Sequence, residues 1–142
     1  MPTTLTRSRL TAAPRAALEG RLRNTLQWPQ WSDMISAVVE TPGPNGPGSP
    51  GEIRIFTRAN TVGRELVLPS AGNTVLTYRV LQGIPLRNYV GKVTIEDLKD
   101  GRRVTWSSSF TAPLPLTGWL FALMLRPFFD KLLLGLVSGF EQ

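Results

Sequence analysis

Residues 89–110 read YVGKVTIEDLKDGRRVTWSSSF, and residues 114–140, LPLTGWLFALMLRPFFDKLLLGLVSGF, follow almost directly. In the first segment apolar and polar residues alternate, which predicts two strands with one buried and one solvated face. The Asp100-Gly101 pair between them is a strong hairpin signal. The second segment is too apolar for an ordinary surface helix. Together they predict antiparallel strands wrapped around an enclosed C-terminal helix, an arrangement that suits an apolar small molecule.

The rest of the chain predicts short strands and helices in an α+β order. Trp28-Pro29-Gln30-Trp31 indicates a tight aromatic bend after the first helix, and Thr117 is a suitable N-cap for the last one. We expect a curved antiparallel sheet of about six to seven strands, two short helices after the first strand and a long C-terminal helix. The expected strands lie at residues 3–12, 52–58, 63–69, 74–81, 87–98 and 102–111, with residues 34–40 leading into another, and the helices at residues 16–26, 32–35 and 117–139.

The chain of 142 residues is expected to form one domain, residues 1–142. Residues 42–51, PGPNGPGSPG, contain only proline, glycine, asparagine and serine. Such a segment forms neither a helix nor a strand ladder, so it predicts a mobile loop. It is a loop within one domain, because the segment before it is too short for an independent core.

The composition excludes several kinds of chemistry. The chain contains neither cysteine nor histidine. This removes disulfides, thiol nucleophiles, thiolate metal sites, Ser-His triads and the commonest general base at neutral pH. We expect no metal and no cofactor, and few catalytic mechanisms remain.

The net charge of +6 comes mostly from arginine and raises the question of a nucleic-acid or membrane partner. The basic residues are scattered and form no run that alternates with exposed aromatic residues, as a single-strand binder needs. We therefore expect a solvated arginine-rich surface and no nucleic-acid partner. The N-terminus lacks the apolar core of a secretory signal, so the expected location is the cytoplasm.

The apolar C-terminal segment is expected to be a buried helix rather than a membrane span. Arg126, Asp130 and Lys131 interrupt it at the middle, where charges cost most. Arg126 and Asp130 are spaced i,i+4 and are expected to pair. A helix that is apolar nearly all round also leaves one side to cover, by a second subunit, a bilayer surface or the sheet edge. Homodimerisation through this helix is the expectation, and contact with a membrane is the less favoured alternative.

Several short motifs follow one another in a specific order and spacing. They are Ala13-Pro14, Trp28-Pro29-Gln30-Trp31, Gly51-Glu52-Ile53-Arg54, Arg64-Glu65-Leu66-Val67, Leu76-Thr77-Tyr78-Arg79-Val80, Gly83-Ile84-Pro85-Leu86-Arg87-Asn88-Tyr89, Val104-Thr105-Trp106-Ser107, Phe110 and Thr117-Gly118-Trp119. In this order they resemble the SRPBCC superfamily, the START/Bet v 1-like helix-grip fold, and in particular its bacterial polyketide cyclase/dehydrase-like branch. The resemblance implies a cavity between the sheet and the last helix. That branch usually carries an aspartate at the end of the first helix, where this chain has Asn24.

Alternation along the strands predicts which side chains face this cavity. In the last strand Trp106 and Ser108 share one face, with Thr105 and Ser107 on the solvent side. Gly91 has no side chain and is expected to widen the cavity. The expected ligand-binding residues are Arg54, Phe56, Glu65, Tyr78, Val80, Tyr89, Gly91, Val93, Trp106, Ser108, Phe121, Leu125, Phe128 and Leu132.

Arg54, Glu65 and Tyr89 are the candidates for a polar end of the cavity and for any catalysis. Arg54 and Glu65 match positions that turn inward in plant hormone receptors of the same fold, so the resemblance implies that they hold the polar end of a ligand. A buried arginine needs a paired carboxylate, which Glu65 on the next strand can supply. The alternative is a cross-strand surface pair that contributes about 0.2–1 kcal/mol.

Three functions remain open from the sequence. The first is a container for a hydrophobic small molecule, such as a lipid-, polyketide- or isoprenoid-like compound. The second is a polyketide cyclase or aromatase, with Arg54 or Tyr89 polarising an enolate oxygen and Glu65 as the base. The third is a peripheral membrane or partner-binding protein that uses the C-terminal helix and the arginines.

Overall fold

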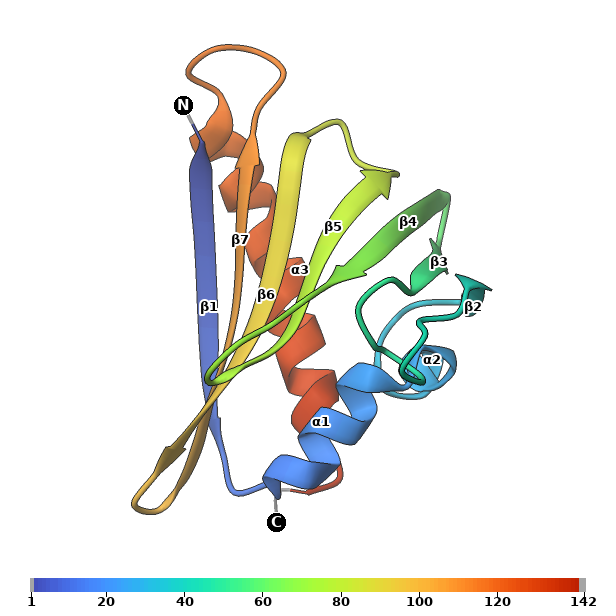
Figure 1. Ribbon diagram of the computed structural model, residues 1–142. Helices are drawn as coiled ribbons and strands as arrows, with labels where there is room; N and C mark the ends of the chain where they lie inside the picture. The colour runs from blue at the N-terminus through green and yellow to red at the C-terminus, as the bar shows by residue number, and fades with distance from the viewer. Residues whose placement is uncertain (1, 141–142) are drawn as a thin grey trace.

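A computed structural model describes residues 2–140 and contains a seven-stranded antiparallel sheet in the order β1-β7-β6-β5-β4-β3-β2 (Figure 1). The elements are β1 (Thr3–Thr11), α1 (Arg15–Arg23), a 3-10 turn η1 (Thr25–Gln27), α2 (Trp28–Trp31), β2 (Ser36–Thr41), β3 (Ile53–Arg58), β4 (Thr61–Leu68), β5 (Thr74–Gln82), β6 (Arg87–Leu98), β7 (Gly101–Thr111) and α3 (Gly118–Val137). The predicted α+β order, with a curved sheet and a long C-terminal helix, is confirmed.

Strands β6 and β7 form the long hairpin that the alternating segment predicts. Val93 lies opposite Trp106 and Ile95 opposite Val104, and all four side chains are buried. Thr105 lies on the other face and is half-buried. Because successive side chains of a strand point to opposite faces, this register turns the apolar set towards α3.

Helix α3 packs on the β1–β7 side of the sheet and against α1 and α2 (Figure 1). Its buried face consists of Phe129, Leu132, Leu133, Leu136 and Val137. Gly135 allows the close approach to α2, because a Cβ at this position would overlap the carbonyl oxygen of Trp31.

The expected i,i+4 pair within α3 is wrong. Asp130 accepts hydrogen bonds from Arg7 of β1, at 2.8 Å from Nε and 3.0 Å from Nη2. The pair therefore ties the helix to the edge strand of the sheet, and Arg126 lies on the exposed side of the helix without this partner. The fold brings Arg7 of β1 next to Asp130, and this tertiary contact replaces the local pair with Arg126 that the i,i+4 spacing predicted.

The helical segment between β1 and β2 differs from the expectation at two points. The first helix ends at Arg23, because Asn24 adopts the non-helical angles φ −86° and ψ 87°. The second short helix is α2 at Trp28–Trp31, so the expected helix at residues 32–35 is wrong. Pro29 suits the first turn of a helix, while Ser32 is already extended (φ −123°, ψ 177°).

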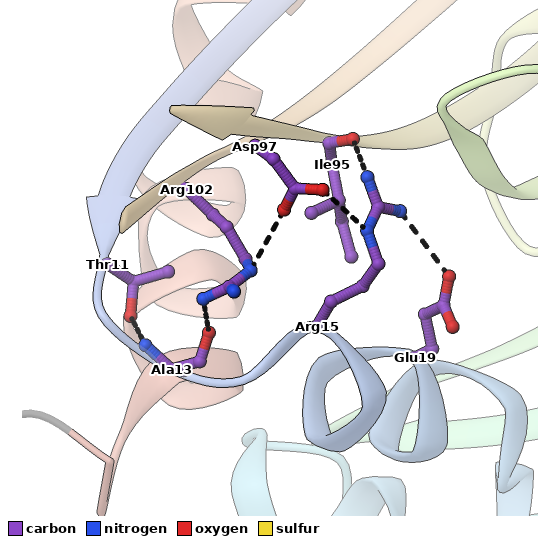
Figure 2. Close-up of polar contacts among 7 residues, drawn as sticks. All are labelled: Thr11, Ala13, Arg15, Glu19, Ile95, Asp97 and Arg102. Atoms are coloured by element: carbon purple, nitrogen blue, oxygen red, sulfur yellow. Dashed lines mark hydrogen bonds and ion pairs between the residues drawn. The ribbon is translucent and has the colours of Figure 1, made fainter. Parts of the chain in front are cut away.

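The connection from β1 to α1 is tied to the β6–β7 hairpin by two arginines (Figure 2). Arg102 donates to the carbonyl oxygen of Ala13 (2.8 Å), and Arg15 donates to that of Ile95 (2.8 Å). Asp97 lies between the two guanidinium groups, 3.0 Å from Arg102 Nε and 3.4 Å from Arg15 Nε. These arginines therefore stabilise a corner of the fold rather than form a basic surface.

Candidate functional site

A cavity of about 520 Å³ lies between the β3–β5 part of the sheet and the middle of α3. Its size falls within the roughly 300–1,000 Å³ that small-molecule sites occupy. The cavity forms here because α3 packs on β1 and β7 and leaves the β3–β5 part of the sheet uncovered. Its walls are Met34, Phe56, Arg58, Thr61, Gly63, Glu65, Tyr78, Val80, Gln82, Gly83, Ile84, Pro85, Tyr89, Met124, Leu125, Pro127, Phe128 and Lys131.

Arg54 and Glu65 form a buried ion pair behind one wall of the cavity. They lie opposite each other on β3 and β4. Arg54 is fully buried and donates from Nε and Nη2 to Glu65 Oε1, at 3.2 and 3.0 Å. The guanidinium also lies 4.6 Å from the ring centroid of Trp28, a cation–π distance. The pair is therefore not a solvated surface contact, and Arg54 contacts a ligand only through Glu65.

The carboxyl group of Glu65 lines the cavity, and its pKa is raised. Burial raises its pKa above the ordinary 4.5, and this effect outweighs the opposing attraction of Arg54. Both hydrogen bonds from Arg54 end on Oε1, which leaves Oε2 as the atom for a ligand. A carboxyl with a raised pKa can donate from this oxygen when protonated and accept when ionised.

Two tyrosines extend the polar wall next to Glu65. The Tyr78 hydroxyl oxygen accepts a hydrogen bond from Trp106 Nε1 (3.0 Å), and the Tyr78 and Tyr89 hydroxyls lie next to each other on this wall. The Tyr89 ring stacks on Phe110 with centroids 5.8 Å apart. Burial raises the pKa of Tyr78 and of Tyr89 well above that of a free phenol. Both hydroxyls are therefore neutral hydrogen-bond donors near neutral pH.

A second buried carboxylate, that of Glu52, is linked to the ion pair through the hydroxyl of Thr25. Arg54 Nη1 donates to Thr25 Oγ1 at 3.5 Å, and Thr25 donates to Glu52 Oε2 at 2.5 Å. Glu52 Oε1 accepts the backbone N–H of Gly48 at 3.0 Å, which anchors the proline- and glycine-rich loop. No sequence pattern identified Thr25 and Glu52, because their contact joins η1 to the start of β3 across a long loop.

The structure divides the expected ligand-binding residues into two groups. Those on the cavity wall are Phe56, Glu65, Tyr78, Val80, Tyr89, Leu125 and Phe128. Gly91, Val93, Trp106, Ser108 and Leu132 lie in the closed core, Phe121 is half-buried against that core, and Arg54 lies behind Glu65. The division follows the position of α3, which fills the space in front of β7.

Gly91 does not widen the cavity, contrary to the expectation. A Cβ at Gly91 would overlap the ring of Tyr78, so the space above this glycine is already filled. Gly91 therefore allows Tyr78 to lie flat on the sheet and to reach Trp106. The glycine that lines the cavity is Gly63, where a Cβ would meet nothing closer than 3.9 Å.

The mouth of the cavity consists of residues that the alternation pattern could not identify. The β3–β4 and β5–β6 turns meet α3 there, and turns have no inward and outward period. Arg58 donates from Nε to Asp33 Oδ2 at 2.9 Å, and its guanidinium lies 4.3 Å from the Phe128 ring centroid. This hydrogen bond holds the pKa of Asp33 below its ordinary value. The mouth is thus lined by an arginine stem and an aromatic ring.

The sequence matches one protein family over nearly its whole length. The family model described as "Polyketide cyclase / dehydrase and lipid transport" matches residues 2–141. The chain belongs to this family. No curated protein matches it.

Solved structures share the helix-grip fold over nearly the whole chain. A START superfamily protein from Mycobacterium smegmatis is 14% identical, with a TM-score of 0.80 and coverage of 96% of each chain. A protein from Nitrosospira multiformis is 18% identical, with a TM-score of 0.78 and coverage of 99% of this chain and 97% of that one. Major latex-like protein 151 from Panax ginseng is 13% identical, with a TM-score of 0.69 and coverage of 92% and 95%. At identities of 13–18%, these structural similarities establish the fold and not the function.

Residues 2–140 contain neither a helix that could span a membrane nor a group of metal-binding side chains. No helix in this range is long and apolar enough to cross a membrane. No three acidic side chains in it gather as a metal site would require.

Proposed function

We propose that the protein binds an apolar small molecule that carries one uncharged oxygen, in the cavity between β3–β5 and α3. The observation that supports this most is the division of the cavity wall. Phe56, Val80, Leu125 and Phe128 provide an apolar surface, and Glu65, Tyr78 and Tyr89 provide a small polar one. An apolar pocket with few convergent polar groups is the usual form of a small-molecule site.

The polar wall favours a ketone or hydroxyl over a carboxylate. Tyr78 and Tyr89 offer hydroxyl protons, and Arg54 is already neutralised by Glu65. A ligand carboxylate at this wall would lie against the Glu65 carboxyl, because the cations that line the cavity, Arg58 and Lys131, lie at its mouth, and burying such a charge is costly. A carbonyl or hydroxyl oxygen needs only one or two donors. Membership of a family whose description names polyketide and lipid substrates agrees with a ligand of this class.

A second candidate function is cyclisation of a poly-β-ketone chain in the same cavity. The supporting observation is Glu65, a carboxyl group with a raised pKa beside two phenolic donors. A general base works best when its pKa approaches the working pH, and phenol protons can stabilise an enolate oxygen. Glu65 would remove a proton from the carbon between two ketones, and Tyr89 would donate a hydrogen bond to the oxygen on which charge develops.

The binding proposal is tested with prodan, a neutral naphthalene ketone whose emission reports the polarity of its surroundings. Saturable binding by the wild type, with a blue shift, is expected. Tyr89→Phe keeps the stacking on Phe110 and removes one donor, so it should weaken binding by about tenfold. Arg79→Gln, on the exposed side of β5, is the matched control and should bind as the wild type does. Equal affinity in wild type and Tyr89→Phe would refute the polar wall.

The two candidate functions differ in what Glu65→Gln does. A container keeps binding prodan, because the amide still donates to a ketone. A cyclase loses turnover of a poly-β-ketone model substrate, followed by the rise of aromatic absorbance, because an amide cannot take up a proton. No turnover by the wild type, with intact prodan binding, would exclude the cyclase for that substrate and leave the container.

A further inference from the structure

An exposed apolar surface covers the loop before α3 and the first turns of that helix. We call it the α3 patch; it consists of Leu114, Leu116, Trp119, Leu120, Leu123 and Met124. Leu116 is 93% exposed, Trp119 66% and Met124 64%. Single exposed apolar residues are ordinary, but a contiguous group of this kind marks an interaction surface. Leu116 is also held at φ 65°, a left-handed conformation that is uncommon for leucine.

The charges around the α3 patch are of one sign. The sequence contains no aspartate or glutamate between Asp100 and Asp130. Arg126 lies on the exposed side of α3, and Arg87 lies opposite Thr111, where the loop to α3 begins. Within residues 2–140 neither of these arginines has an ion-pair partner, whereas Arg15 and Arg102 are paired with Asp97 (Figure 2). The α3 patch is therefore apolar at its centre and cationic at its edges.

The α3 patch is continuous with the mouth of the cavity. Met124 belongs to both, and Pro127 and Lys131, one and two turns further along α3, line the mouth. A surface that contacts the α3 patch therefore also lies at the opening through which an apolar molecule would enter.

We propose that the α3 patch docks on an anionic lipid bilayer, with the Trp119 ring and the leucines at the level of the headgroups and Arg87 and Arg126 against lipid phosphates. Tryptophan prefers the interface between water and hydrocarbon, and apolar side chains with flanking cations bind anionic lipid surfaces. Trp119 and Leu123 lie one turn apart on the same face of α3, which suits a helix that lies in the plane of the interface.

A bilayer matches the α3 patch better than a second copy of the chain does. In a two-fold dimer the same surface meets itself, so Arg126 of one copy would approach the cations of the other. The α3 patch offers no carboxylate to neutralise them, and the whole chain carries a net charge of +6. An anionic bilayer supplies the opposite charge together with an apolar layer.

The proposal is tested with vesicles of phosphatidylcholine, with and without phosphatidylglycerol, at low and high salt. Sedimentation measures binding, and tryptophan emission reports on the α3 patch. Trp28, Trp31 and Trp106 are buried, so a blue shift on binding arises from Trp119. We expect binding to anionic vesicles with a blue shift, and weaker binding at high salt. This readout does not depend on whether the cavity holds a ligand, so it can fail while the proposed function stands.

Matched variants separate docking from simple charge attraction. Arg126→Glu and Arg79→Glu change the net charge equally, but Arg79 lies on the solvent side of β5. We expect Arg126→Glu to weaken binding roughly 25-fold, at about fivefold for each basic charge, and Arg79→Glu to have a clearly smaller effect. L116S/L123S should abolish the blue shift, while L10S/V38S, at exposed positions on β1 and β2, should retain it.

Three results would overturn the proposal. One is the absence of binding to anionic vesicles at low salt. Another is an equal loss of binding in Arg126→Glu and Arg79→Glu without a shift in tryptophan emission, which indicates attraction through net charge alone. The third is a dimer of the wild type in sedimentation velocity. If L116S/L123S is then a monomer while L10S/V38S remains a dimer, the α3 patch binds a second copy of the chain rather than a bilayer.

Discussion

Replacing Glu65 by alanine tests the buried ion pair on which the polar wall depends. Arg54 is fully buried and gives two of its hydrogen bonds to Glu65 Oε1. Without the carboxylate its charge keeps the 3.5 Å contact with Thr25 and the cation–π contacts with Trp28, Phe56 and Tyr78. An uncompensated buried charge is among the most destabilising changes a single substitution can make.

The magnitude follows from the position of Glu65 on the cavity wall. Removing one partner of a buried pair costs about 3–5 kcal/mol of unfolding free energy. Glu65 lines an open cavity, so its removal admits water towards the guanidinium, which lowers the cost. We therefore expect a loss of about 3 kcal/mol, at the lower end of that range. R54M/E65L, which replaces both charges by apolar side chains of similar size, should recover most of it.

Urea denaturation followed by circular dichroism measures this loss from the midpoint and slope. Glu40→Ala is the control, because Glu40 of β2 pairs with Arg64, the neighbour of Glu65 on β4, but both side chains are about one third exposed. Exposed pairs contribute little to stability, so this variant should unfold close to the wild type. A Glu65→Ala midpoint as close to the wild type as that of Glu40→Ala would refute the buried pair.

Three further predictions concern the cavity and its wall. Gly63→Leu should obstruct the cavity and abolish prodan binding while changing the unfolding free energy by less than about 1 kcal/mol, because a Cβ there meets no atom closer than 3.9 Å; retained binding would contradict the location of the site. Gly91→Ala should displace Tyr78 and cost about 1–3 kcal/mol in urea denaturation; no change would contradict the close packing. Burial raises the Glu65 pKa, so the folded state holds this proton more tightly than the unfolded state and the unfolding free energy falls as pH rises from 4.5 through the raised value; Glu65→Gln should remove this part of the pH dependence of urea unfolding, and an unchanged slope would contradict it.

The strands of the hairpin and the C-terminal helix were predictable because their signals are local. Alternation over residues 89–110 identified the inward face, and Val104 and Trp106 are buried as it requires. The position of Thr117 before α3 is likewise as predicted. The location of α2 was not predictable, because Trp28 and Trp31 are helical through packing on each other, on Leu22 and on Phe56 rather than through a local pattern.

The candidate site was only partly predictable, for a reason that lies in the packing of α3. Alternation gives the face of each side chain, so it selected Tyr78 and Tyr89, which line the cavity, and equally Trp106 and Ser108, which do not. Only the position of the helix over β1 and β7 separates these pairs. At the mouth Phe128 was predicted, but Arg58 and the residues of the two turns were missed, because turns follow no period.

The central claim, that the cavity holds one apolar molecule, is tested most directly by native mass spectrometry of freshly purified wild-type protein beside Gly63→Leu, followed by denaturing extraction. We expect one apolar, oxygen-containing molecule for each wild-type chain and none in Gly63→Leu, whose side chain would project into the cavity and obstruct it. The same molecule retained at equal occupancy by Gly63→Leu would contradict the claim, because the ligand would then lie outside the cavity between β3–β5 and α3.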